Sequence, residues 1–294
     1  MDPVRRMSDL PARVRFVVVA VLLTCAAMTS VGAAQGTPDD AAFGEVFELE
    51  SVTTVAGWRV ESWIPADWDR AFETVLRVVD AAGSVAFELR DSVVVAFEQD
   101  AGPGWRAELI AVAPGDDLTG DGVPNLLVEA YTGGAHCCFH YALLALGDEL
   151  EVVWEGFLAD AGGVVVDLAN DGRRQLMSAD MSFAYTFCSF AETPAPAVVL
   201  AFEPRGVRVA NLDFPEVYER ELVWALERVL LLPEDAGPDS RACALAQLVL
   251  TLLYGGREEL AEAALTRLFV SDDAEGFREA LWAIVDESPW FVRR

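Results

Sequence analysis

The feature that most constrains the fold is a change of hydrophobic period near residue 213. From about Phe43 to Asn211, short segments alternate apolar and polar residues, and Gly, Asp, Pro and Asn separate them. Clear examples are Phe47–Thr54, Trp58–Ile64, Val85–Arg90, Leu126–Tyr131, Cys138–Leu146 and Leu150–Glu155. Strands at such regular spacing, with few helical segments between them, indicate an antiparallel all-β unit. Ala66–Val79 fits either a short helix or a strand.

Beyond Phe214 the apolar residues recur at helical spacing. The expected helices are Val217–Leu232, Arg241–Tyr254, Glu258–Phe269 and Glu275–Val285. Ser240 is the expected N-cap of the second helix, and Gly255-Gly256 is expected to end it. We therefore predict a mainly β fold, built as propeller-like blades or open antiparallel sheets, followed by a small C-terminal α-helical bundle. The expected domains are a β domain over residues 35–212 and a helical domain over residues 213–294.

The N-terminus has the pattern of a secretory signal peptide. Four Arg residues precede an apolar run from Phe16 to Val31, and small residues follow up to Ala34. The run is shorter than the roughly 20 residues that a membrane span needs. We predict a signal peptide over residues 1–34, cleavage near Ala34, and an exported protein (periplasmic or extracellular) with no membrane span in the mature chain. An uncleaved anchor and a lipoprotein modified at Cys25 are the alternatives.

Charge narrows the classes of partner. The chain carries a formal net charge of −27, and all 21 of its Lys+Arg residues are Arg. A surface of this sign argues against nucleic acid and anionic lipid, which need a basic footprint. The lack of Lys excludes a Schiff-base lysine and a phosphate loop that ends in Lys. The expected partner is therefore a protein or a glycan.

One segment, residues 117–125, has the composition of a cation-binding loop. Oxygen-bearing side chains occupy its positions 1, 3, 5 and 9, and a backbone carbonyl is available at position 7. Gly122 permits the sharp turn that folds these oxygens inward. Hard oxygen ligands at alternate positions are what Ca²⁺ requires. An EF-hand is excluded because its twelfth position would need a bidentate Glu, where this chain has Val128, and because the flanks are strand-like.

The pattern Asp-x-Thr-Gly-Asp-Gly-x-Pro-Asn-Leu, followed by a strand, resembles the calcium loop of FG-GAP/VCBS-type repeats, the integrin-α-like β-propeller blades. The stretch Tyr131–Cys138 resembles one found in exported bacterial proteins with such a repeat. The resemblance covers residues 117–203 and implies bladed β structure in which Ca²⁺ stiffens a loop between strands. Carried over by position, the implied ligands are Asp117, Thr119, Asp121, the carbonyl of Val123, and Asn125.

A second copy of the loop runs from Asp167 to Gln175, 50 residues further on. It keeps the Asp residues at positions 1 and 5 and the Gly at position 6, but it has Ala169 at position 3. We expect this copy to be a turn without metal. The 50-residue spacing suits a blade-sized repeat.

Four cysteines remain after signal cleavage, an even number that suits disulfides in an exported protein. The sequence favours a bridge from Cys137 or Cys138 to Cys188, and the apolar neighbours of Cys243 favour a buried thiol. A rival hypothesis uses the face that His136, Cys138 and His140 would share on a strand, where two imidazoles and a thiolate could hold Zn²⁺ or copper.

No nucleophile elbow, zinc-protease motif or dinucleotide fingerprint is present in the sequence. Three hypotheses follow. The first is an exported, non-enzymatic binding or scaffold protein with a Ca²⁺-stabilised β unit. The second is a periplasmic transition-metal-binding protein that uses the His-Cys-Cys-x-His segment. The third is a hydrolase with a carboxylate pair that sequence motifs do not reveal.

Overall fold

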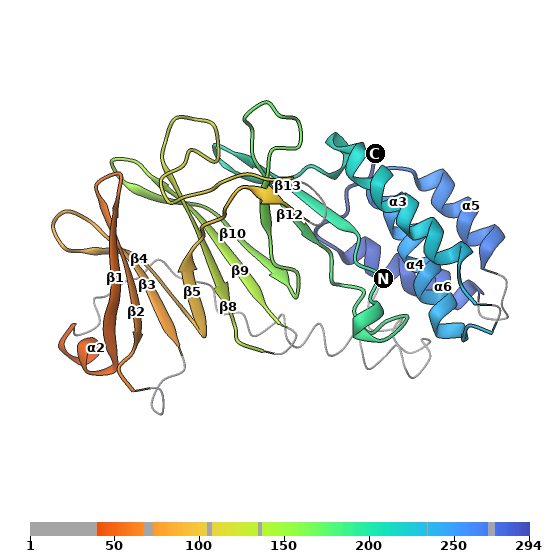
Figure 1. Cartoon of the computed structure of the whole chain (residues 1–294), viewed down its shortest axis with the longest axis horizontal. Coiled ribbons are helices and arrows are strands. Elements are labelled where there is room, and N and C mark those ends of the chain that lie inside the picture. The colour runs from red at the N-terminus through yellow and green to blue at the C-terminus, as the bar shows by residue number, and fades with distance from the viewer. Residues whose placement is uncertain (1–39, 68–72, 105–107, 135–136, 234, 270–273) are drawn as a thin grey trace, which may run out of the picture. The chain divides into compact units, whose positions relative to one another are not determined.

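The computed structural model describes residues 40–67, 73–104, 108–134, 137–233, 235–269 and 274–294 (Figure 1). The predicted signal peptide and its cleavage site near Ala34 lie outside these residues. The chain divides into two compact units. Of the described residues, one unit contains residues 40–179 and 198–210, and the other contains residues 180–197 and 211–294. The prediction of a mainly β fold followed by C-terminal helices is confirmed.

The first sheet is a four-stranded antiparallel meander that follows a short helix, α2 (Asp40–Val46). Its strands, in sheet order, are β1 (Phe47–Val55), β2 (Trp58–Pro65), β3 (Thr74–Val79) and β4 (Val85–Asp91). The first hairpin turns at Ala56 and Gly57, both with positive φ (50° and 88°), as a two-residue turn between twisted strands requires. The ambiguous segment before residue 80 thus ends in a strand.

The second sheet has the order β10-β9-β8-β5 and packs on the first. Its strands are β5 (Val93–Ala96), β8 (Asn125–Tyr131), β9 (Phe139–Leu146) and β10 (Leu150–Ala159). Alternate residues of a strand point to one face, so one apolar face of each sheet meets the other. The shared core includes Leu76, Val78, Val94, Leu126, Val128 and Leu144, all at most 1% exposed.

The third sheet has six strands in the order β14-β13-β12-β11-β7-β6. They are β6 (Gly102–Pro103), β7 (Glu108–Leu109), β11 (Val164–Val166), β12 (Gln175–Ala179), β13 (Ala197–Glu203) and β14 (Gly206–Val209). The last four form a meander like β5, β8, β9 and β10 in the second sheet. In both meanders an Asp/Gly loop immediately precedes the second strand: residues 117–125 enter β8, and residues 167–175 enter β12.

Four helices follow: α3 (Pro215–Leu230), α4 (Pro238–Tyr254), α5 (Glu258–Leu268) and α6 (Ala274–Glu287) (Figure 1). Every residue of α4 from Cys243 to Tyr254 is buried. This follows from its sequence, because a helix that is apolar on all faces is stable only when other elements pack on all of them. The helix begins at Pro238 with Gly237 as its N-cap, so the expectation of Ser240 as N-cap is wrong; Pro suits the first turn because it lacks the N–H that would go unpaired there. The predicted end at Gly255-Gly256 is confirmed.

A buried carboxylate ties the ends of α4 and α6 to the segment that begins at Asp180. Asp180 is 0% exposed, and its Oδ2 accepts hydrogen bonds from the hydroxyls of Tyr254 and, at 2.5 Å, Ser288. Its Oδ1 accepts the backbone N–H of Ser182 at 2.8 Å. Burial and the neighbouring Asp180 carboxylate raise the pKa of Tyr254 above its ordinary value, so the tyrosine is the hydrogen-bond donor.

Candidate calcium loop and cysteine segments

Residues 117–125 fold into a turn that depends on glycine at two places. Gly120 and Gly122 have φ of +76° and +87°, a region that side chains with a Cβ avoid. A Cβ placed on either would meet nothing within 4 Å, so backbone conformation, not crowding, requires glycine there. The loop therefore closes directly onto the first residue of β8, Asn125.

Asp117 organises the backbone of this loop. Its Oδ1 accepts a hydrogen bond from the N–H of Gly120 at 2.7 Å, and its Oδ2 accepts one from the N–H of Gly122 at 2.9 Å. Asp121 acts more locally, because its Oδ1 accepts from the N–H of Val123 at 2.9 Å. Both carboxylates thus face the loop's own backbone.

Asn125 closes the loop from inside the core. Its side chain belongs to a residue only 1% exposed, and its Oδ1 accepts hydrogen bonds from the N–H groups of Leu118 (2.8 Å) and Thr119 (3.1 Å). The hydroxyl of Thr119 lies 3.4 Å from Asn125 Oδ1 and 3.4 Å from Asp117 Oδ1. The structure therefore brings together three of the predicted ligand side chains, while Asp121 turns toward Val123.

The donor set suits a hard cation. Carboxylate, hydroxyl and amide oxygens are ligands for Ca²⁺. Each Asp117 oxygen accepts one N–H and keeps a second lone pair, whereas Asn125 Oδ1 already accepts two N–H groups and would have to release one of them to bind the ion. Among the described residues, no three His, Cys, Asp or Glu side chains are grouped as metal ligands. A cation in this loop would thus be held by Asp117 and Asp121 with the neutral oxygens of Thr119, Val123 and Asn125, and by water at the remaining positions.

The loop of residues 167–175 has the same backbone scaffold. Asp167 Oδ2 accepts from the N–H of Gly172 at 2.9 Å, and its Oδ1 accepts from the N–H of Asp171 at 3.1 Å. Gln175 takes the place of Asn125, because its Oε1 accepts the N–H of Leu168 at 3.0 Å. Positive φ recurs at the fourth and sixth positions, 53° at Asn170 and 84° at Gly172.

Two arginines distinguish the second loop. The Arg173 guanidinium pairs with Asp171, with Nη2 2.6 Å from Oδ2, and its hydrogen bonds hold the pKa of Asp171 below the ordinary value. Arg174 Nη1 lies 3.1 Å from Oδ2 of Asp116, the residue just before the first loop. The two loops are therefore neighbours in space. In the second loop, the Arg173 guanidinium already neutralises the carboxylate of Asp171.

The His-Cys-Cys-x-His segment is only partly described. His136 lies outside the described residues, and Cys138 is bonded to Cys137 in a disulfide, which leaves no thiolate for a metal. The His140 ring packs edge-on against Phe157, with centroids 4.8 Å apart. Burial lowers the pKa of His140, against an opposing effect of Asp91. Of the three ligands in the transition-metal hypothesis, the structure therefore describes only the His140 imidazole as available, because Cys138 is in a disulfide.

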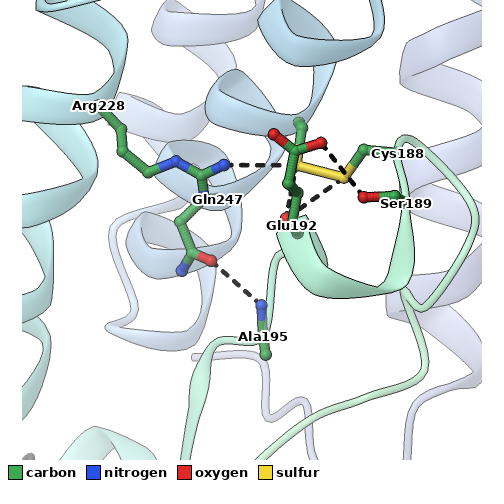
Figure 2. The surroundings of a disulfide bond; sticks show 7 residues. Cys188, Ser189, Glu192, Ala195, Arg228 and Gln247 are labelled. Carbon is green, nitrogen blue, oxygen red and sulfur yellow. Dashed lines mark hydrogen bonds between the residues drawn. A yellow bond between two sulfur atoms is a disulfide. The ribbon is translucent and has the colours of Figure 1, made fainter.

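The second disulfide differs from the pairing expected from sequence. Cys188 is bonded to Cys243, with Cα atoms 5.7 Å apart, and not to Cys137 or Cys138 (Figure 2). The physical reason is that the segment from Asp180 to Ala197 belongs to the same compact unit as the helices, so Cys188 lies against α4. Cys243 is buried as expected (0% exposed), but as half of a disulfide and not as a thiol.

Comparisons with known proteins give two partial relatives. The chain is 33% identical over 116 residues to an uncharacterised protein of Sinorhizobium fredii, an alignment that covers 38% of this chain and 18% of that protein. It is 32% identical over 123 residues to a probable thylakoid lumen protein of Synechocystis sp., covering 40% of this chain and 35% of the relative. The chain thus spans about a third or less of each relative's length. No family model and no solved structure matches it.

Within the part of the chain that the structure describes, every helix is too short or too polar to cross a membrane.

Proposed function

We propose that this is an exported, non-enzymatic binding or scaffold protein whose β unit is stabilised by Ca²⁺ held in the loop of residues 117–125. The observation that carries the proposal is that three of the implied ligand side chains converge. The Thr119 hydroxyl lies 3.4 Å from Asp117 Oδ1 and 3.4 Å from Asn125 Oδ1. Export is supported by the N-terminal pattern and by the probable thylakoid lumen protein among the relatives.

Each residue of the loop has a separate part in the proposed site. Asp117 and Asp121 supply the negative charge, and Thr119, Asn125 and the Val123 carbonyl supply neutral oxygens. A bound Ca²⁺ would neutralise the two carboxylates and cross-link the turn. With only two charged ligands, the affinity belongs at the weak end, about 10⁻⁴–10⁻³ M, as in other extracellular modules.

The loop is well placed to stabilise more than itself. Asn125 is both its last residue and the first residue of β8, whose apolar side chains enter the core shared by the first two sheets. Asp116 connects to Arg174 at the entrance of β12. A rigid loop would therefore fix the start of β8 and, through the Asp116–Arg174 ion pair, the start of β12, which belongs to a different sheet. Such rigidity would suit a scaffold.

Thermal unfolding of the full chain with and without Ca²⁺ tests the proposal. At 10 mM Ca²⁺ we expect a rise in Tm that corresponds to about 1–3 kcal/mol, from mass action on the folded state. Asp121→Ala should abolish the rise. Asp171→Ala, the matched change in the second loop, should leave it intact. A Tm that does not respond to millimolar Ca²⁺, or an equal rise in Asp121→Ala, would contradict the proposal.

The partner that such a scaffold would present or hold is proposed to be a protein or a glycan. The net charge of −27 disfavours nucleic acid and anionic lipid surfaces and favours a neutral or basic partner.

A further inference from the structure

We propose that the Cys188–Cys243 disulfide is a thiol-exchange site, opened by a dithiol reductant that attacks Cys188 while Cys243 leaves beside Arg228. This inference does not depend on the calcium proposal, because all of its residues belong to the helical unit.

The two sulfurs differ in accessibility. Cys243 is 0% exposed, in the buried stretch of α4, whereas Cys188 is half-buried in the segment that packs against that helix. An incoming thiolate must approach one sulfur along the line of the bond that breaks, and a fully enclosed atom cannot be reached this way. The difference in burial therefore assigns Cys188 as the attacked sulfur and Cys243 as the leaving group.

Arg228 is the group beside Cys243 that stabilises a leaving thiolate. Arg228 Nη2 lies 3.7 Å from Cys243 Sγ (Figure 2), and its guanidinium carbon lies 5.3 Å from the Trp224 ring centroid. The carbonyl oxygen of Glu192 lies 2.6 Å from Cys243 Sγ, where it stabilises the protonated thiol that forms after the bond has opened, and not the thiolate. A neighbouring cation lowers the pKa of a thiol, and a thiol of lower pKa leaves faster.

A pocket lies beside Arg228 and Glu192, the two residues that contact Cys243 Sγ. Its volume is about 580 Å³, and Arg228 and Glu192, both in contact with the disulfide, are part of its lining. Glu227 and Asp235 also line it, so the pocket wall carries carboxylates as well as the Arg228 guanidinium. This charge balance favours a neutral or cationic thiol over an anionic one.

The reaction balances as two successive exchanges. The thiolate of the reductant forms a bond to Cys188 Sγ, and the Cys188–Cys243 bond breaks with its electron pair on Cys243 Sγ. The second thiol of the reductant, after losing its proton, then attacks its own sulfur in the mixed disulfide and releases the Cys188 thiolate. The protein gains two electrons and two protons at neutral thiols, and the dithiol becomes a cyclic disulfide.

Opening the bond leaves other contacts between the segment and α4. The backbone N–H of Ala195 donates to Gln247 Oε1 at 3.1 Å, and the Asp180–Tyr254 hydrogen bond lies further along. Reduction is therefore expected to loosen the stretch around Cys188 without unfolding the helices.

The test follows reduction of the full-length chain by dithiothreitol, which is uncharged near neutral pH, with thiols alkylated at intervals and located by peptide mass. The variants are Arg228→Gln, Arg228→Lys, and Arg220→Gln as a control on an exposed arginine of the same helix. We expect Arg228→Gln to slow opening of Cys188–Cys243 about fivefold. Arg228→Lys and Arg220→Gln should stay within about twofold of wild type.

A second readout holds even if a variant folds poorly. With cysteamine, a cationic monothiol, the mixed disulfide on the wild-type chain should form at Cys188, with Cys243 as the free thiol. Equal rates for Arg228→Gln and Arg220→Gln, an adduct on Cys243, or a bond that opens only when circular dichroism shows the helices unfolding would each overturn the proposal. The Cys137–Cys138 pair lies on a separate peptide and is scored separately.

Discussion

The two Asp/Gly loops share one backbone and differ in the charges placed on it. Both use a first-position Asp to accept two N–H groups of the turn, and both use a ninth-position amide to accept the N–H of the second residue. The first loop adds a hydroxyl at position 3, from Thr119. The second has Ala169 there and brings in Arg173 against Asp171.

This difference separates folding from metal binding. The hydrogen-bond scaffold forms in both loops, and what the two loops share is the first Asp, the Gly at position 6 and the terminal amide. Cation binding is expected only where a third side-chain oxygen joins the carboxylates and no arginine competes. The following predictions test this separation, from the largest expected effect to the smallest.

The terminal amides should matter most for stability. Asn125→Ala removes the acceptor for two N–H groups, including that of buried Leu118, and we expect the free energy of unfolding to fall by about 2–4 kcal/mol. Gln175→Ala removes the acceptor of one N–H and should cost about 1–2 kcal/mol. Urea unfolding measures both changes without added calcium.

The exposed Glu151 of β10 provides the control, because Glu151→Ala should change stability by less than about 0.5 kcal/mol. If Asn125→Ala were as mild as this control, the amide would not be what closes the loop, and the shared scaffold would lose its basis.

A graft should transfer cation binding to the second loop. The double substitution Ala169→Thr with Arg173→Val supplies the missing hydroxyl and removes the competing guanidinium. We expect calorimetry to detect a second Ca²⁺ per chain, with an additional stabilisation of about 1 kcal/mol at 10 mM. Arg173→Val alone should bind a single ion. A grafted chain that still binds one ion would show that position 3 and the arginine do not explain the difference.

The smallest effect concerns Asp171 itself. Hydrogen bonds from Arg173 lower the pKa of this carboxyl, so Arg173→Val should raise that pKa toward the ordinary value. A lowered pKa favours the folded state above the ordinary carboxyl pKa, and this contribution is lost as the pH falls through the lowered value. Carboxyl ¹³C NMR titration follows the change, with Arg220→Val as the control. An unchanged Asp171 titration would mean that the pair seen in the structure does not persist in solution.

Local features were predictable from sequence because they depend on neighbours along the chain. The alternation of apolar residues marked strands such as Trp58–Pro65, and the glycines at 255 and 256 marked the end of α4. The Asp/Gly spacing placed the turn of residues 117–125 between strands, which the structure confirms. Its proposed cation is a separate matter and stays a prediction.

Long-range features were not predictable, because spacing does not say which distant segments meet. The Cys188–Cys243 bond forms because residues 180–197, which follow β12, pack with the helices. No local sequence pattern predicts this packing. The burial of Asp180 beneath Tyr254 likewise brings together residues 74 positions apart. Arg174 meets Asp116 across 58 positions, although their loops are recognisable as copies.

A crystal structure grown in 10 mM Ca²⁺, with anomalous scattering recorded, tests the central claim most directly. The account predicts an anomalous peak in the loop of residues 117–125, about 2.3–2.6 Å from oxygens of Asp117, Asp121 and Asn125, and none in the loop of residues 167–175. A first loop without a peak, with the Asp117 and Asp121 carboxylates directed apart, would contradict it.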